Sequence, residues 1–141
     1  PWADLQDPAH AGLQRLVRDL NRLYRTQPAL HRLDCEGRGF EWLAADERAL
    51  SVYAWLRLDE SGRPLVVVCN MTPVPRHGFR LGVPEGATRW RELLNTDSAY
   101  YGGSNLGNGG AVDVQPLPAH GRAQSLALTL PPLATLFLAP E

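Results

Sequence analysis

The sequence contains no lysine, no isoleucine, almost no net charge and no long hydrophobic run, and these absences exclude several classes of protein. Without lysine, the chain cannot carry a phosphate-binding loop, whose glycine-rich turn ends in Gly-Lys-Ser/Thr. The 14 cationic and 15 anionic side chains leave a net charge of −1. Surfaces that bind nucleic acid are usually basic, so no nucleic-acid partner is expected. No apolar run approaches ~18 residues, so the sequence predicts no membrane-spanning helix and no membrane partner.

Length and cysteine content narrow the choice further. At 141 residues the chain is far shorter than the roughly 250 residues of an eight-fold β/α barrel. It can form one domain with one core, or one domain with an appended helix. Cys35 and Cys69 are too few for the disulfide framework of a small secreted domain. We therefore expect two reduced cysteines, packed as small hydrophobic side chains, in a cytoplasmic protein.

The first thirty residues predict one amphipathic helix. Asp7 followed by Pro8 is a typical helix start, and Pro28 is expected to end the helix because the residue before a proline avoids helical geometry. Apolar residues recur between these limits with the 3.6-residue period of a helix. They form one stripe, made of Leu13, Leu16, Val17, Leu20, Leu23 and Tyr24. A helix of this kind has to bury its stripe against another part of the protein.

From residue 39 onward the hydrophobic period changes to two, which indicates β-strands. Eight short strands are expected, at residues 39–44, 50–57, 65–70, 77–83, 88–95, 111–115, 124–130 and 133–138. The first two predict a hairpin around the polar stretch 45–48, and the apolar run 65–70 suits a central strand. In the seventh strand we expect Leu126 and Leu128 to point inward and Ser125 outward. Strands joined by glycine- and proline-rich turns, with no helix between them, predict an antiparallel β-sandwich.

The segment 98–110 interrupts this pattern with five glycines between residues 102 and 110. Long ordered loops inside compact domains are often functional. This loop lacks the G-x-G-x-x-G spacing of a dinucleotide site. Ser104 does not fit a nucleophile elbow either, because Leu106 occupies the place of the second glycine.

Two interpretations of this loop stay open. The glycines can simply permit positive φ angles in an irregular structural loop. Alternatively, the loop contacts a sugar or a neighbouring domain. Tyr100 and Tyr101 would then stack on pyranose rings, with Trp90 as a further candidate, while Asn105 and Asn108 would bond to hydroxyl groups.

No catalytic or metal-binding set emerges from the remaining residues. The four histidines, at positions 10, 31, 77 and 120, have no metal-ligand spacing. His31 and Cys35 lie four residues apart in a predicted loop without an orienting group, so we expect no dyad. The sequence places no acidic pair across a cleft, as glycoside chemistry would require. Trp42, Trp55 and Trp90 suit a core or an interface better than a carbohydrate platform.

Five segments together resemble the C-terminal end of bacterial 1,4-α-glucan (glycogen) branching enzymes of the α-amylase superfamily. They are WADLQDPAHAGLQRLVRDLNRLYRTQPALH (2–31), GFEWLAADERALSVYAWLR (39–57), LVVVCNMTPVPRHGFRLGVP (65–84), RELLNTDSAYYGGSNLGNGG (91–110) and LTLPPLATLFL (128–138). The most specific stretches are DLNRLYRTQPALH and LLNTDSAYYGGSNLGN. The resemblance covers nearly the whole chain in order.

The resemblance implies a fold and a domain division. Residues 1–30 would be the last helix of a catalytic β/α barrel, and residues 31–141 the all-β Greek-key sandwich that closes these enzymes. The family transfers an α-1,4-glucan chain to a 6-hydroxyl group through a covalent aspartyl intermediate. Its catalytic motifs do not occur in this sequence, so no catalytic residue carries over, and no metal or organic cofactor is implied. Pro1 would then mark a boundary of expression or processing.

Three roles remain open for the domain itself. In the first, residues 95–97 and 100–110 contact the catalytic barrel of the same polypeptide and support it. In the second, Tyr100, Tyr101 and Trp90 form a secondary site for α-glucan, that is, glycogen or amylose. The alternative to both is a free-standing carbohydrate-binding β-sandwich module, which a reading frame extending upstream into barrel motifs would eliminate.

Overall fold

The computed structural model describes residues 2–141, so Pro1 and the boundary expected there lie outside the described residues. One α-helix, α1 (Pro8–Thr26), precedes the strands. The strands are β1 (Phe40–Glu47), β2 (Val52–Leu58), β3 (Pro64–Asn70), β4 (Arg76–Val83), β5 (Arg89–Asn95), β6 (Ala111–Asp113), β7 (Gln124–Leu130) and β8 (Ala134–Pro140). Short 3₁₀ helices are η1 (Trp2–Gln6), η2 (Pro28–Leu30), η3 (Gly37–Gly39) and η4 (Ala99–Tyr101). Each of the eight predicted strands is therefore confirmed, with ends displaced by a few residues.

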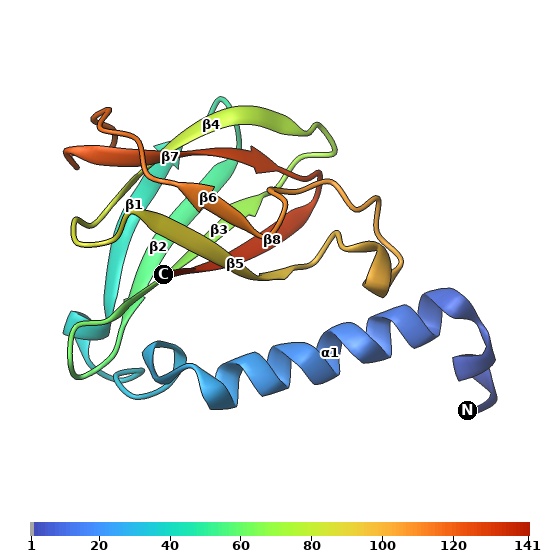
Figure 1. Cartoon of the computed structure of the whole chain (residues 1–141). Helices are drawn as coiled ribbons and strands as arrows, with labels where there is room; N and C mark the ends of the chain where they lie inside the picture. The colour runs from blue at the N-terminus through green and yellow to red at the C-terminus, as the bar shows by residue number, and fades with distance from the viewer. Residues whose placement is uncertain (1) are drawn as a thin grey trace.

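The strands form two antiparallel sheets. The larger has the order β1-β2-β3-β8-β5-β6, and the smaller pairs β4 with β7. The hairpin predicted from the first two strands is confirmed, but β1 continues through the polar stretch 45–47 because two irregularities in its pairing with β2 absorb extra residues. Helix α1 lies on the side of the larger sheet opposite β4 and β7 (Figure 1).

The main core lies between the two sheets. It is built from alternate residues of the strands, chiefly leucines and valines, and includes Val52, Ala54, Leu56, Val66, Val68, Leu81, Trp90, Leu126, Leu128, Leu136 and Leu138. The inward direction predicted for Leu126 and Leu128 is confirmed, since both are fully buried. Ser125 points away from this core as expected, yet it is also fully buried. The segment after β6 crosses it, and the Ser125 hydroxyl donates to the carbonyl of Leu117 at 2.6 Å.

The outer face of the larger sheet carries a second, smaller cluster. Leu65, Val67 and Cys69 of β3 pack there with Ala29 of η2, which makes β3 apolar on both faces. Its predicted central position is confirmed. The expectation for the cysteines holds for Cys69, whose thiol lies 3.2 Å from the Thr135 hydroxyl and whose pKa is raised by burial. For Cys35, which is also free, the expected packing is wrong, because this residue is exposed in the link between η2 and η3.

The limits of helix α1 agree with the sequence. The Asp7 carboxylate accepts a hydrogen bond from the amide of Ala9 at 2.8 Å, and Pro8 is the first helical residue. The helix ends at Thr26, two residues before Pro28. Among residues 2–141, no helix is long and apolar enough to cross a membrane.

Most of the apolar stripe of α1 is not buried. Leu23 is 8% exposed, but Leu13 and Val17 are 59% and 50% exposed. The described residues therefore leave much of the apolar side of the helix uncovered, while Leu23 near its C-terminal end is buried.

A tight turn between β2 and β3 gives the domain an acid-sensitive group. Asp59 is 4% exposed, and its carboxylate accepts hydrogen bonds from the hydroxyl and amide of Ser61 and from the amide and guanidinium of Arg63. Burial raises the pKa of Asp59, but these bonds outweigh it and lower the pKa to about 2. The unfolded state, with a pKa near ~3.9, thus binds more protons in this range. We expect the free energy of unfolding to fall as the pH drops from about 4 to about 2.

This pH dependence can be measured by denaturant unfolding across the acid range. Asp59→Asn keeps the acceptor oxygen and removes the titration, so it should flatten the acid limb of the stability curve. Asp46→Asn is the matched control, because the side chain of Asp46 is 88% exposed. An acid limb that is equally steep in Asp59→Asn and in the parent chain would contradict the assignment.

Candidate functional site

The glycine-rich segment 98–110 is held closed by its own hydrogen bonds. The Asp97 carboxylate accepts from the amides of Ser104 and Leu106, at 3.0 and 3.2 Å, and from the Ser104 hydroxyl. The Asn105 side chain accepts from the amide of Ala99 at 3.2 Å, and Asn105 itself has a φ of 64°. A Cβ on Gly103 would lie 2.2 Å from the carbonyl oxygen of Asp97. The loop therefore needs its glycines for close backbone contacts, and it is an ordered structure.

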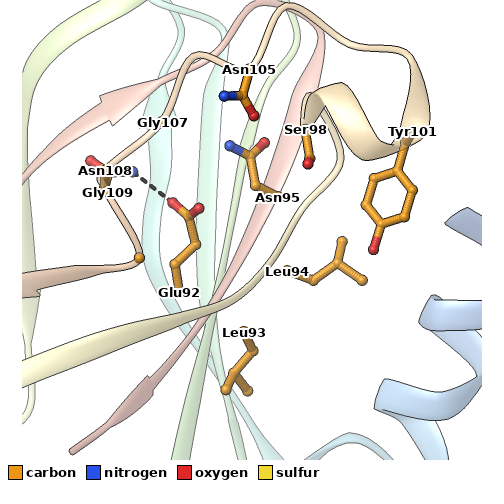
Figure 2. Close-up of a pocket in the computed structure, with 11 residues that line it drawn as sticks. Glu92, Leu93, Leu94, Asn95, Ser98, Tyr101, Asn105, Gly107, Asn108 and Gly109 are labelled. Atoms are coloured by element: carbon orange, nitrogen blue, oxygen red, sulfur yellow. Dashed lines mark hydrogen bonds between the residues drawn. The ribbon is translucent and has the colours of Figure 1, made fainter.

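Beneath the loop lies a polar hollow of about 390 Å³ (Figure 2). The Asn108 amide donates to the Glu92 carboxylate at 3.0 Å and to the carbonyl of Thr129 at 3.1 Å, and its oxygen accepts from the amide of Thr129 at 2.8 Å. Asn95 donates to the carbonyl of Leu106 at 2.8 Å. Asn105 and Asn108, the two predicted hydrogen-bonding partners of a sugar, thus already use their side chains to hold the loop.

The tip of the loop, η4, rests on helix α1. The Arg15 guanidinium donates to the Tyr100 carbonyl at 2.8 Å, and Arg18 donates to the Tyr100 hydroxyl at 2.9 Å. The Tyr101 hydroxyl donates to the Asp19 carboxylate at 3.0 Å. Figure 2 shows Tyr101 pointing from the loop toward the helix. Both predicted tyrosines therefore contact the helix, and we call this set of contacts the η4–α1 clasp.

Gly12 allows this close approach. It is buried beneath η4, and a Cβ at this position would lie 2.2 Å from the carbonyl oxygen of Tyr101. A backbone carbonyl cannot yield as a flexible side chain does, so any larger residue at position 12 has to separate the helix from the loop. The clasp depends on a glycine inside a helix, where glycine costs about 1 kcal/mol relative to alanine.

The electrostatics of the clasp favour a neutral tyrosine. Burial, followed by the hydrogen bond to Asp19, raises the pKa of Tyr101 to about 12. The phenol thus remains protonated and donates to the carboxylate throughout the neutral range. The hydrogen bond to Tyr100 raises the pKa of Arg18, which keeps its positive charge.

A second set of contacts anchors the C-terminal end of helix α1. The Tyr24 hydroxyl donates to the Asp34 carboxylate at 3.1 Å, and Arg57 of β2 forms an ion pair with the same carboxylate. Arg57 also donates to the carbonyl of Gly39 at 3.2 Å. Its hydrogen bond lowers the pKa of Asp34. Helix α1 is therefore held to the sandwich at its middle, through η4, and at its C-terminal end, through Asp34 and Arg57.

Trp90 does not join the other candidate residues. It is 1% exposed in the core between the sheets, so its ring cannot stack on a sugar that approaches from solvent. In the sequence, Trp90 stands between Arg89 and Arg91, and this alternation indicates that the Trp90 side chain points inward from the strand. The structure thus brings together Tyr100, Tyr101, Asn105 and Asn108 at the loop and removes Trp90 from the set.

Trp42 and Trp55, which the sequence analysis assigned to a core or an interface, instead form a partly exposed aromatic cluster with Phe40 on strands β1 and β2. Trp42 and Trp55 face each other across the two strands, with ring centroids 5.9 Å apart, and Phe40 lies 5.1 Å from Trp42. Trp42 is 53% exposed and Phe40 is 40% exposed. The signal was present in the sequence, because residues 40 and 42 share one face of a strand. On the loop, Tyr100 is also 53% exposed, but the Arg15 guanidinium lies over its ring, 5.1 Å from the centroid.

Comparison with known proteins now decides the family. Residues 42–141 match the sequence model of the alpha amylase, C-terminal all-beta domain. The chain belongs to this family. The match to this all-beta domain begins within β1, so it covers the sandwich and leaves helix α1 outside.

Curated relatives of this all-beta domain extend over nearly the whole chain. It is 60% identical over 139 residues to the 1,4-alpha-glucan branching enzyme GlgB of Ralstonia nicotianae, covering 97% of this chain and 18% of that protein. The proteins of the same name from Burkholderia vietnamiensis and Pseudomonas putida are 60% and 58% identical, and each match covers 99% of this chain and 19% of the relative. The chain thus spans about a fifth of the length of the curated relatives it matches.

A solved structure supports the fold of the domain. The crystal structure of alpha-amylase from H. orenii aligns with a TM-score of 0.50 and 20% sequence identity, covering 89% of this chain and 20% of that one. The predicted antiparallel sandwich is confirmed by this likeness and by the family match.

Proposed function

We propose that this chain is the non-catalytic C-terminal domain of a cytoplasmic 1,4-α-glucan branching enzyme, which transfers α-1,4-glucan chains to form α-1,6 branches in glycogen. The observation that carries the proposal is the 58–60% identity, over nearly the whole chain, to relatives of that name. Because the chain corresponds to about a fifth of those relatives, the catalytic residues would lie in the preceding part of the polypeptide.

The role proposed for the domain is to support the catalytic β/α barrel. Residues 1–30 would be the last helix of that barrel, and residues 31–141 the sandwich domain. The contacts of α1 support this role, because η4 holds the middle of the helix through Tyr100 and Tyr101, while the Asp34–Arg57 pair holds its C-terminal end through Tyr24. The sandwich would then fix the position of one barrel helix.

The isolated chain is expected to have no branching activity. With amylose as substrate, the full-length polypeptide should lower the iodine absorbance as branches form, while residues 1–141 alone should leave it unchanged. Branched product from the isolated chain would contradict the proposal. A reading frame without barrel motifs upstream would instead favour the free-standing carbohydrate-binding module.

A second candidate function, contact with α-glucan, is favoured by the aromatic cluster of Phe40, Trp42 and Trp55. Its rings are partly exposed, and their centroids lie 5.1–6.4 Å from one another. Aromatic faces with a polar surrounding suit the apolar faces of pyranose rings. The cluster replaces the loop tyrosines as the proposed glucan contact, because the hydroxyl groups of both tyrosines bond to α1 and the Arg15 guanidinium lies over the Tyr100 ring.

Titration with maltoheptaose, followed by tryptophan fluorescence, tests this second candidate. Loss of a central aromatic contact usually costs more than ~1 kcal/mol, so Trp42→Ala should weaken binding by about 5-fold or more. Tyr100→Ala is the matched control and should leave the affinity unchanged. The reverse result, with binding lost in Tyr100→Ala and kept in Trp42→Ala, would return the glucan site to the loop.

A further inference from the structure

We propose that two adjoining hollows between the C-terminal half of helix α1 and strand β5 bind a small phosphate monoester. The first hollow has a volume of about 400 Å³ and the second about 430 Å³. Both are lined by Thr26, Gln27, Arg91 and Leu93, so they meet where the helix runs beneath β5 (Figure 1). The site goes beyond the proposed function, because it shares no lining residue with the aromatic cluster and does not depend on the preceding polypeptide.

Two arginines without partners line these hollows from separate elements. Arg22 comes from α1 and lines the first hollow, while Arg91 comes from β5 and lines both. Within residues 2–141, neither guanidinium has a hydrogen bond or an ion pair. Arg63 lines the second hollow from the end of the turn between β2 and β3. Positive charge from three parts of the chain therefore borders the two neighbouring hollows.

The carboxylates around the hollows already have cationic partners. The pairs are Asp19 with Arg18, Asp59 with Arg63, and both Asp113 and Glu141 with Arg89. The Asp19 carboxylate also accepts from the Tyr101 hydroxyl at 3.0 Å. The two unpartnered arginines are therefore the cationic groups left to attract an anion.

The end of helix α1 is compatible with an anion beside it. The last carbonyl groups of a helix carry partial negative charge when they lack partners. Here the Thr26 hydroxyl donates to the carbonyl of Arg22 at 2.9 Å, and the amide of Gln27 donates to the carbonyl of Leu23 at 2.9 Å. These bonds offset part of the negative charge at this end of the helix.

The donors favour a phosphate monoester over other anions. A guanidinium presents paired N–H groups that match two oxygens of a phosphate. A phosphate monoester carries about −1.5 to −2 charges at pH 7, which suits two guanidinium groups, whereas a carboxylate carries one. A hollow of about 400 Å³ accommodates a small ligand, and Leu23 and Leu93 offer an apolar wall to its organic part. A ligand held by both Arg22 and Arg91 would bridge α1 and β5.

Titration of the ¹⁵N-labelled 141-residue chain with glucose 6-phosphate, followed by amide NMR shifts, tests this site. Saturable shifts are expected in residues 19–27 and 89–94. Arg22→Gln and Arg91→Gln should each weaken binding by about 10-fold, because each removes a hydrogen bond between charged groups. Arg25→Gln is the matched control, since Arg25 is exposed on the same helix and lines neither hollow, and it should keep the affinity. Glucose, which has no charge, should cause no shift in these residues.

Three results would each overturn the site. The first is the absence of saturable shifts in residues 19–27 and 89–94 up to about 10 mM glucose 6-phosphate. The second is equal weakening by Arg25→Gln and Arg91→Gln, which would assign the binding to general charge attraction. The third is binding of glucose as tight as that of glucose 6-phosphate. Since Arg22 and Arg91 are exposed, both variants should fold as the parent chain does, which circular dichroism checks.

Discussion

Replacing Trp90 by alanine is expected to lower the free energy of unfolding by about 3–5 kcal/mol. Trp90 is the largest fully buried side chain of the domain, and it lies in the core between the two sheets. Its removal leaves a cavity that the surrounding strands cannot fill, because each is fixed by pairing on at least one side. Denaturant unfolding of the purified chain, followed by circular dichroism, measures the loss.

Two matched variants sharpen this prediction. The indole nitrogen of Trp90 is buried and has no hydrogen-bond partner among the described residues. Trp90→Phe removes this unsatisfied donor along with some volume, so its loss should be much smaller than that of Trp90→Ala. Trp42→Ala removes the same side chain from a site that is 53% exposed and should cost less than ~1 kcal/mol. Similar losses for Trp42→Ala and Trp90→Ala would contradict the assignment of Trp90 to the core.

Replacing Gly12 by alanine is expected to open the η4–α1 clasp. The added Cβ would lie 2.2 Å from the Tyr101 carbonyl oxygen, so the helix and the loop must move apart. The hydrogen bonds from Arg15 to Tyr100 and from Tyr101 to Asp19 would then be lost. Overpacking of this kind usually costs about 1–3 kcal/mol. Amide hydrogen exchange should become faster in residues 12–20 and 98–103 and remain unchanged in β3.

The sign of the stability change in Gly12→Ala shows whether helix propensity or the contact with η4 dominates. In a helix, alanine is favoured over glycine by about 1 kcal/mol, so helix propensity alone would stabilise the variant. A net loss must therefore come from the contact with η4. Gly37→Ala serves as control, because a Cβ at that position meets nothing within 4 Å. If Gly12→Ala were as stable as Gly37→Ala, the clasp would contribute little to holding the helix.

Much of the fold could be predicted from the sequence, because the patterns that indicate its strands and its helix lie within a few consecutive residues. Alternation in β7 and the double-sided apolar run of β3 each reflect a few consecutive residues, and Asp7-Pro8 sets the helix start within one turn. The burial of Ser125 escaped prediction, since it depends on a segment that crosses from outside the strand. The extension of β1 escaped as well, because bulges depend on the register with a partner strand.

The candidate site was predicted only in part, for a similar reason. The tyrosines stood out in the sequence, but their partners Arg15, Arg18 and Asp19 are more than eighty residues away. No pattern within the loop predicts that a glycine in a distant helix leaves room for the Tyr101 carbonyl. Tyr100 and Tyr101 could therefore be singled out from the sequence, while what they touch had to come from the structure.

The place of β8 in the larger sheet has a consequence for the order of events during synthesis. β8 is the last of the eight described strands in chain order, yet it lies between β3 and β5 and joins β1-β2-β3 to β5-β6. Until β8 emerges, β3 and β5 each present an unpaired edge. The 3₁₀ helix η4 then follows β5, which is not yet paired with the strands β1-β2-β3. The clasp on α1 can therefore close only after β8 has emerged, although α1 precedes all eight of these strands in the chain.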